Sequence, residues 1–180
     1  MSYTTRELTF TALFTTLIAA GALLSIPLGP VPFTLQVTMV LLAGMVLGSR
    51  LGLLSVAAYL CLGLVAPVFA GGTSGIAVLI GPTAGYLWGF IPAVALTGWI
   101  AKKTNRSLGG CIMAGVLGLA PIYVLGAGWL GMQQQLSPSV TIAVGILQFL
   151  PLDVLKAVVA GLAARSLVSL PLGLPGLLDQ

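Results

Sequence analysis

Long apolar runs dominate the chain, and short polar or glycine- and proline-rich stretches separate them. An α-helix rises 1.5 Å per residue, so about 20 apolar residues cross the ~30 Å hydrocarbon layer of a bilayer. The runs show no ten-residue alternation of polar and apolar positions, which favours helices over a membrane β-barrel. The pattern predicts an all-α integral membrane protein with six transmembrane helices, at about residues 8–27, 37–47, 51–69, 83–100, 108–130 and 151–168.

Two of the connections contain helix-breaking residues within apolar sequence. Residues 28–36 hold two prolines and a glycine, and residues 71–83 are rich in glycine around a short apolar piece, 76–80. Irregular backbone at membrane depth is tolerated only where it is buried in protein or faces a cavity. We therefore expect irregular loops that cap a ligand cavity, the second of them re-entrant or lid-like.

The region after residue 137 contains two helix signals. Ser137 and Pro138 form a typical helix start, but Pro151 would interrupt a helix that continued to residue 168. Such a helix would be ~46 Å long, more than a bilayer requires. We predict two pieces instead: a short helix at about 138–149 near the outer surface, and a spanning helix that begins near Pro151. Residues 171–180 form a predicted cytoplasmic tail.

Composition supports a single membrane domain over residues 1–180. Hydrophobic residues make up 58% of the chain and charged residues 6%, and the mean hydropathy is +1.15. Soluble domains carry about 25% charged residues. The first apolar run leads directly into more membrane sequence, so a cleavable signal peptide is not expected. Cys61 and Cys111 lie in apolar runs and the chain has no His, so we expect packing cysteines, with no metal, cofactor or disulfide.

The positions of the basic residues predict the topology. In the six-span arrangement the loops at 28–36, 71–83 and 131–138 carry no Lys or Arg, and the opposite side carries Arg6, Arg50, Lys102, Lys103, Arg106 and Arg165. By the positive-inside rule both termini are cytoplasmic and the uncharged loops are external. The net charge of +4 is explained by this topology, and no nucleic-acid partner is predicted.

Asp153 and Lys156 are the two charges that the topology does not explain. They lie three residues apart, with Cβ atoms ~5–6 Å apart on one helix, in the outer half of the last span. They could form a neutralised ion pair that only fixes helix packing. We favour a ligand site, because ionisable residues in membrane spans usually face an interior or a cavity.

The two side chains suit a small, partly apolar ligand that forms hydrogen bonds. An ionised Asp only accepts and a Lys only donates, so together they suit an amide or urea group, and Lys156 could instead bind a carboxylate. The candidates for the rest of the site are Phe33 and Tyr86 as apolar walls and Thr34, Gln36 and Thr73 as polar contacts.

Four ordered blocks resemble a known family. They are residues 31–36 (VPFTLQ), the glycines of 71–75 (GGxxG), residues 81–90 (GPTAGYLxGF) and residues 149–156 (FLPLDVLK). Over nearly the whole chain, to about Leu170, they resemble BioY, the substrate-binding S component of biotin transporters of the energy-coupling factor (ECF) type. The resemblance implies a six-helix bundle that holds biotin near the outer face. It places Asp153 and Lys156 in the biotin site and adds Gly72 to the candidates.

The resemblance also implies partners and a location. An S component works with a transmembrane coupling (T) subunit and a pair of ATP-binding subunits in the lipid bilayer of a bacterial or archaeal cell (inner) membrane. Its docking face is an Ala-xxx-Ala pattern in the first helix, and the nearest match here is Ala12, Thr16 and Ala20. Two positions depart from the family pattern: Ala84 and Leu152 each stand where a glycine is common.

The predicted function is high-affinity binding of biotin for uptake, with transport inward when the chain couples to an ATP-driven module. Asp153 would accept a ureido N–H of biotin, and Lys156 would donate to the ureido oxygen or to the carboxylate. The chain has no Walker A sequence, so it is not expected to hydrolyse ATP itself. The alternative is a secondary transporter or channel for another small amphipathic solute. An enzyme is not expected, because no nucleophile–base pair or metal constellation is evident.

Overall fold

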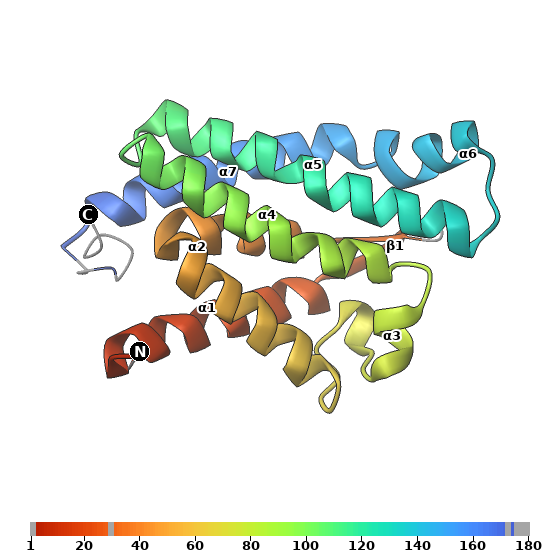
Figure 1. The fold of residues 1–180 in the computed structure, drawn as a ribbon, viewed down its shortest axis with the longest axis horizontal. Helices are drawn as coiled ribbons and strands as arrows, with labels where there is room; N and C mark the ends of the chain where they lie inside the picture. Colours follow the sequence, from red (N-terminus) through yellow and green to blue (C-terminus); the bar gives the residue numbers. More distant parts are fainter. Residues whose placement is uncertain (1–2, 29–30, 172–173, 175–180) are drawn as a thin grey trace.

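The computed structural model describes residues 3–28, 31–171 and 174, and these are mostly helical (Figure 1). The helices are α1 (Thr5–Leu23), α2 (Gln36–Gly63), α3 (Ile76–Ile80), α4 (Ala84–Lys103), α5 (Leu108–Gln133), α6 (Pro138–Ile142) and α7 (Leu150–Ser169). Strands β1 (Ser25–Leu28) and β2 (Val31–Thr34), a 3-10 turn η1 (Ala70–Gly72) and a π-helical turn η2 (Ala143–Leu147) complete the described elements. The mostly helical fold class is confirmed.

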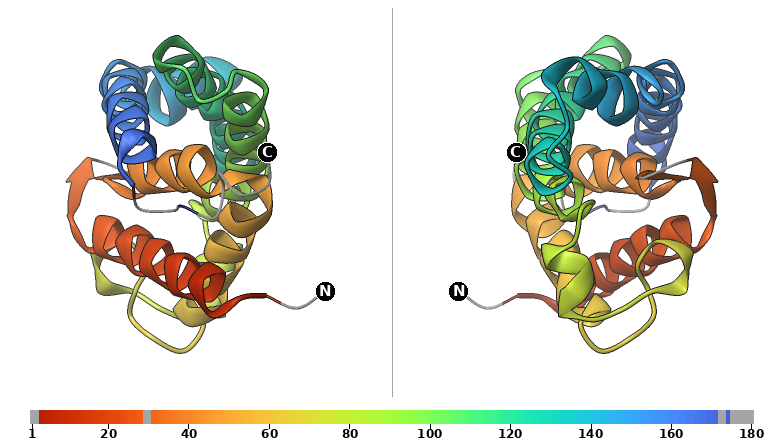
Figure 2. Two further views of the ribbon diagram at one scale, coloured as in Figure 1. Left: turned by 90° about the vertical axis from the view of Figure 1, so that its left-hand side faces the viewer. Right: turned by 90° about the vertical axis from the view of Figure 1, so that its right-hand side faces the viewer.

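Helix α2 lies at the centre of the bundle. It packs against α1, α4 and α7, and α5 packs between α4 and α7. End-on views place α1 on one side of α2 and α4, α5 and α7 on the other (Figure 2). Helix α1 begins and α7 ends at the same end of the molecule, whereas α3 and α6 lie toward the opposite end (Figure 1). This arrangement gathers the connecting segments of the far end around one region of the bundle.

Four helical stretches of the described chain are long and apolar enough to cross a membrane. They are Gln36–Gly63, Ala84–Lys103, Leu108–Gln133 and Pro138–Ser169. Helix α1 is not among these four. A multi-pass membrane protein follows from these stretches, and the count of six spans stays a prediction.

Helix α2 contains a break that separates the predicted second and third spans. Gly48 has φ 79° and ψ 174°, a conformation that glycine adopts without a steric penalty. The Arg106 side chain lies beside the break, and its Nε donates to the Met45 carbonyl at 3.0 Å. Arg106, grouped above with the charges of the cytoplasmic side, is buried, and its side chain satisfies a carbonyl close to the break.

The first predicted connection forms a β-hairpin rather than an irregular loop. Helix α1 ends at Leu23 instead of continuing to Pro27, and β1 pairs with β2 in antiparallel register, with Ile26 opposite Phe33. Prolines usually argue against strands because they cannot donate to the ladder. In a two-stranded hairpin both strands are edge strands, where proline is tolerated. The helix does end before the prolines, as predicted, but the predicted irregular loop is a regular hairpin.

The third predicted span ends earlier than expected. Helix α2 stops at Gly63 rather than at Phe69. Pro67 disfavours helical backbone at the residue before it, which accounts for an irregular segment after the helix. The Phe69 ring then folds back over Gly63, where a Cβ atom would lie only 2.1 Å from the ring. This return brings Phe69 into the core, where it is fully buried.

The region before α7 is only partly a regular helix. The α-helical part of the predicted 138–149 segment is limited to α6, and the π-helical turn η2 follows it. Helix α7 begins at Leu150, with Pro151 and Asp153 in its first turn. Of the predicted tail at 171–180, the structure describes only Pro171 and Leu174, and Leu174 is buried. The rest of that prediction lies outside the described residues.

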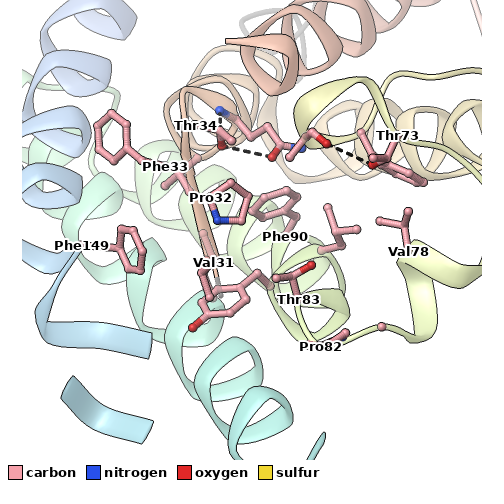
Figure 3. Close-up of a pocket in the computed structure, with 18 of the residues that line it drawn as sticks. Val31, Pro32, Phe33, Thr34, Thr73, Val78, Pro82, Thr83, Phe90 and Phe149 are labelled. Atoms are coloured by element: carbon pink, nitrogen blue, oxygen red, sulfur yellow. Dashed lines mark hydrogen bonds between the residues drawn. The ribbon is translucent and has the colours of Figure 1, made fainter. Parts of the chain in front are cut away.

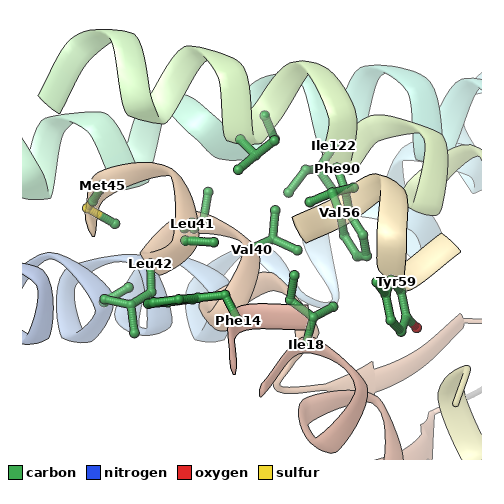
Figure 4. Packing of buried hydrophobic residues seen from close by; sticks show 14 of the residues in the cluster. Phe14, Ile18, Val40, Leu41, Leu42, Met45, Val56, Tyr59, Phe90 and Ile122 are labelled. Atoms are coloured by element: carbon green, nitrogen blue, oxygen red, sulfur yellow. The ribbon is translucent and has the colours of Figure 1, made fainter. Parts of the chain in front are cut away.

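The core is a continuous apolar cluster that joins α1, α2, α4 and α5. Figure 4 shows Phe14 and Ile18 of α1 against Val40 and Leu41 of α2, with Phe90 and Ile122 nearby. Lipid is as apolar as these side chains, so helix association in a membrane depends on close packing rather than on the hydrophobic effect. Small residues at helix contacts are therefore expected to matter most.

Gly98→Ala tests this close packing. A Cβ at Gly98 would lie 2.3 Å from the Ser49 backbone nitrogen, so the α2–α4 contact has to open. We expect the variant to be destabilised by about 1–3 kcal/mol, as for other overpacked cores, and to show a lower thermal unfolding midpoint in detergent. Gly128→Ala is the matched control, because a Cβ there meets nothing within 4 Å. Equal midpoints for the two variants would contradict the prediction.

Candidate functional site

A cavity of about 320 Å³ lies between the hairpin, η1, α3 and helices α2, α4, α5 and α7. Its size is at the lower end of the ~300–1,000 Å³ range of small-molecule sites. Figure 3 shows hairpin residues Val31 to Thr34 on one side and Phe90, Thr83 and Phe149 on others. The wall is largely apolar and aromatic, and a few polar groups interrupt it.

Asp153 and Lys156 form an ion pair in the wall of this cavity. Lys156 Nζ lies 2.9 Å from Asp153 Oδ1, and the two residues are only 9% and 7% exposed. Both belong to α7, and Pro151 is tolerated in the first turn because its missing N–H would have no helical acceptor there. Asp153 lies in the same turn, where the helix dipole stabilises a negative charge. The sequence-predicted pair is thus brought together, buried, beside a cavity.

Lys156 also holds the hairpin. Its Nζ donates to the Thr34 carbonyl at 2.6 Å and lies 3.5 Å from the centroid of the Phe33 ring. A cation over an aromatic face is attracted by the ring quadrupole. The lysine therefore joins α7 to β2, two segments more than 120 residues apart in the sequence.

Asp153 has a second partner that the sequence reasoning missed. The Tyr123 hydroxyl of α5 donates to Asp153 Oδ2 at 2.7 Å. Tyr123 itself lines the cavity and is 7% exposed. A buried tyrosine usually finds a partner for its hydroxyl. The single tyrosine in the apolar run of 108–130 therefore indicates a polar partner in the core, although not which one.

Gln36 belongs to a second polar network beside the pair. Its Nε2 donates to the Tyr59 hydroxyl, and its Oε1 accepts from the Thr34 hydroxyl at 3.1 Å. Tyr59 in turn donates to the Val68 carbonyl at 3.3 Å. The amide of Gln36 therefore has both ends engaged, and it ties the hairpin to the segment that follows α2.

Tyr86 and two tryptophans fix the other rim of the cavity. The Tyr86 hydroxyl donates to the Gly145 carbonyl in the π-helical turn at 2.8 Å. Trp88 Nε1 donates to the Leu79 carbonyl and Trp129 Nε1 to the Gly81 carbonyl, at 3.0 and 2.9 Å. The two tryptophan bonds satisfy carbonyls at the end of the short α3 helix and so hold the connection before α4 in place.

All of the predicted site residues except Gly72 line the cavity. Gly72 is exposed and has φ 74°, so it shapes the turn η1 rather than the cavity wall. Thr73 lines the cavity, and its hydroxyl is bonded to the Ala70 carbonyl. The lining residues that the sequence reasoning did not select include Tyr123, Phe69, Phe90 and Phe149.

The arrangement provides a buried carboxylate, a buried ammonium group and aromatic walls. Such a cavity suits a compact ligand that offers N–H donors and an acceptor at one end and apolar surface elsewhere. Among the described residues, no group of three His, Cys, Asp or Glu side chains is placed to hold a metal ion.

Comparisons with known proteins converge on one family. The model of the BioY family matches residues 1–171. The biotin transporter BioY of Thermotoga maritima is 45% identical over 166 residues, which cover 92% of this chain and 97% of that protein. Biotin transporter BioY2 of Lactococcus lactis is 35% identical and covers 90% of each chain. The crystal structure of the S-component for biotin from an ECF-type ABC transporter superposes with a TM-score of 0.84 at 32% identity, over 94% of this chain and 96% of that one.

Proposed function

Because the chain belongs to the BioY family, we propose that it binds biotin in the cavity described above and takes it up as the S component of an ECF transporter. It is a transporter component and not an enzyme. The observation that carries the proposal is the buried Asp153–Lys156 pair in the wall of an aromatic cavity of about 320 Å³. The same pair stands out in the sequence because it places two charges within an apolar run.

The chemistry of biotin fits the groups of this cavity. Biotin has a ureido ring with two N–H groups and one carbonyl, an apolar thiophane ring and a carboxylate tail. Asp153 accepts one ureido N–H, and Lys156 donates to an oxygen of the ligand. Phe33 and Tyr86 line the cavity and are the groups proposed to cover the apolar ring. Thr34, Gln36 and Thr73 complete the polar rim.

The energising partners are a T subunit and two ATP-binding subunits, and α1 is the proposed docking helix. Ala12, Thr16 and Ala20 are exposed on it, on the side away from the buried Phe14 and Ile18. The Thr16 hydroxyl donates to the Ala12 carbonyl, which leaves a face of small groups. Small residues let another helix approach closely. This supports docking through α1. The proposed location is the cell (inner) membrane, with both termini on the cytoplasmic side.

Biotin binding by the purified chain tests the function. We expect the protein in detergent to bind biotin saturably with one site per chain, and to release it chemically unchanged. Isothermal titration calorimetry measures both affinity and stoichiometry. Lipoate is the matched competitor, because it carries a sulfur ring and a carboxylate tail but no ureido group, and it should not displace biotin. Absence of saturable binding, or equal competition by lipoate, would contradict the proposal.

A further inference from the structure

Asp153 is held from two different helices. Lys156 of α7 binds Oδ1, and the Tyr123 hydroxyl of α5 binds Oδ2 at 2.7 Å. Asp153 and Tyr123 are each 7% exposed, so water has little access to replace either partner. The two carboxylate oxygens are thus fixed separately, one by a cation and one by a neutral hydroxyl.

The contact from α5 determines how the carboxylate is turned. The χ2 torsion of aspartate is broad, so one hydrogen bond to one oxygen leaves the carboxylate plane free to rotate. Lys156 lies on the same helix as Asp153 and has a flexible side chain with rotatable donors. Tyr123 has a rigid ring on a separate helix and bonds the other oxygen, so it removes this freedom. A carboxylate accepts about four hydrogen bonds, and two acceptor positions therefore remain for a ligand.

We infer that Tyr123 is a positioning residue that orients the Asp153 carboxylate toward the cavity, and that it thereby sets the selection for ligands with a ureido N–H. The inference rests on the proposed function, since biotin is the ligand that supplies this N–H. Tyr123 acts through Asp153 and needs no ligand contact of its own. Tyr86 offers an internal comparison, because it lines the same cavity but its hydroxyl is bonded to the Gly145 carbonyl.

The test compares two ligands on three proteins. The ligands are biotin and a biotin analogue methylated on one ureido nitrogen, and the proteins are the wild type, Tyr123→Phe and Tyr86→Phe. A hydrogen bond to a charged group contributes enough that Tyr123→Phe should bind biotin about 10- to 100-fold more weakly. The affinity ratio of biotin to the methylated analogue should fall at least about fivefold, because a rotated carboxylate no longer favours the intact N–H. Tyr86→Phe should keep the wild-type ratio.

The ratio separates positioning from structural support. A Tyr123→Phe protein that loses affinity for both ligands equally would overturn the inference and leave the proposed function in place, as would one with wild-type affinities. Wild-type protein that fails to bind biotin would overturn both. The phenylalanine keeps the aromatic ring, and an unchanged thermal midpoint and elution profile of the variant in detergent establish that the fold is intact.

Discussion

Asp153→Asn should weaken biotin binding by about a hundredfold or more while the fold is retained. The substitution removes the acceptor for the ureido N–H and leaves Lys156 as a buried cation without its carboxylate partner. It also replaces one carboxylate oxygen with an NH₂ donor between two existing donors, Lys156 Nζ and the Tyr123 hydroxyl. The NH₂ avoids the Lys156 ammonium only when it turns toward the Tyr123 hydroxyl, which must then accept a hydrogen bond instead of donating one. Calorimetric titration with biotin measures the loss.

Two further variants separate the causes of this loss. In the double variant Asp153→Asn with Lys156→Met, the unpaired cation is gone, so much of the stability lost in the single variant should return. Biotin affinity should not return, since the acceptor is still missing. Glu7→Gln is the control for loss of a carboxylate, because Glu7 is a partly exposed residue that caps α1. If Asp153→Asn bound biotin with wild-type affinity, Asp153 would not be part of the binding site.

The sequence predicted those features that depend on local composition. Continuous apolar runs predicted the long helices α4, α5 and α7 to within a few residues of their observed ends. The ion pair was predicted because charge in an apolar run is costly and therefore conspicuous. Glycine and proline predicted breaks at Gly48 and before Pro151. Each of these inferences needed only neighbouring residues.

The sequence did not predict features that depend on contacts between distant segments. The hairpin was missed because its prolines and glycine indicate only that a helix ends, whereas its position beside Lys156 of α7 is a tertiary contact. Tyr123 was missed because a tyrosine in an apolar helix gives no sign of which group its hydroxyl meets. Gly72 was selected with its sequence block, yet its positive φ shapes a turn outside the cavity. In these cases the role of a residue depends on the direction of its backbone or side chain in the fold, which the residue type does not reveal.

Exchanging the two charges, Asp153→Lys with Lys156→Asp, should not restore biotin binding, although the pair remains three residues apart on one helix. At position 156 the surroundings favour a cation: the Thr34 carbonyl accepts from Nζ, and the Phe33 ring presents its negative face. Neither the Thr34 carbonyl nor the face of the Phe33 ring can donate a hydrogen bond to a carboxylate placed there. At position 153 the Tyr123 hydroxyl donates, and the first turn of α7 disfavours positive charge.

We therefore expect the exchanged variant to bind biotin at least about a hundredfold more weakly than the wild type. Its thermal midpoint should lie below that of Lys156→Met, because two misplaced buried charges cost more than the single unpaired carboxylate that Lys156→Met leaves. Calorimetric titration and thermal unfolding in detergent, run on the wild type and both variants, measure the two effects. Recovery of biotin affinity in the exchanged variant would mean that a neutral pair is sufficient at this site. The orientation of the Tyr123 hydroxyl, the Thr34 carbonyl and the Phe33 ring would then have no effect on biotin binding.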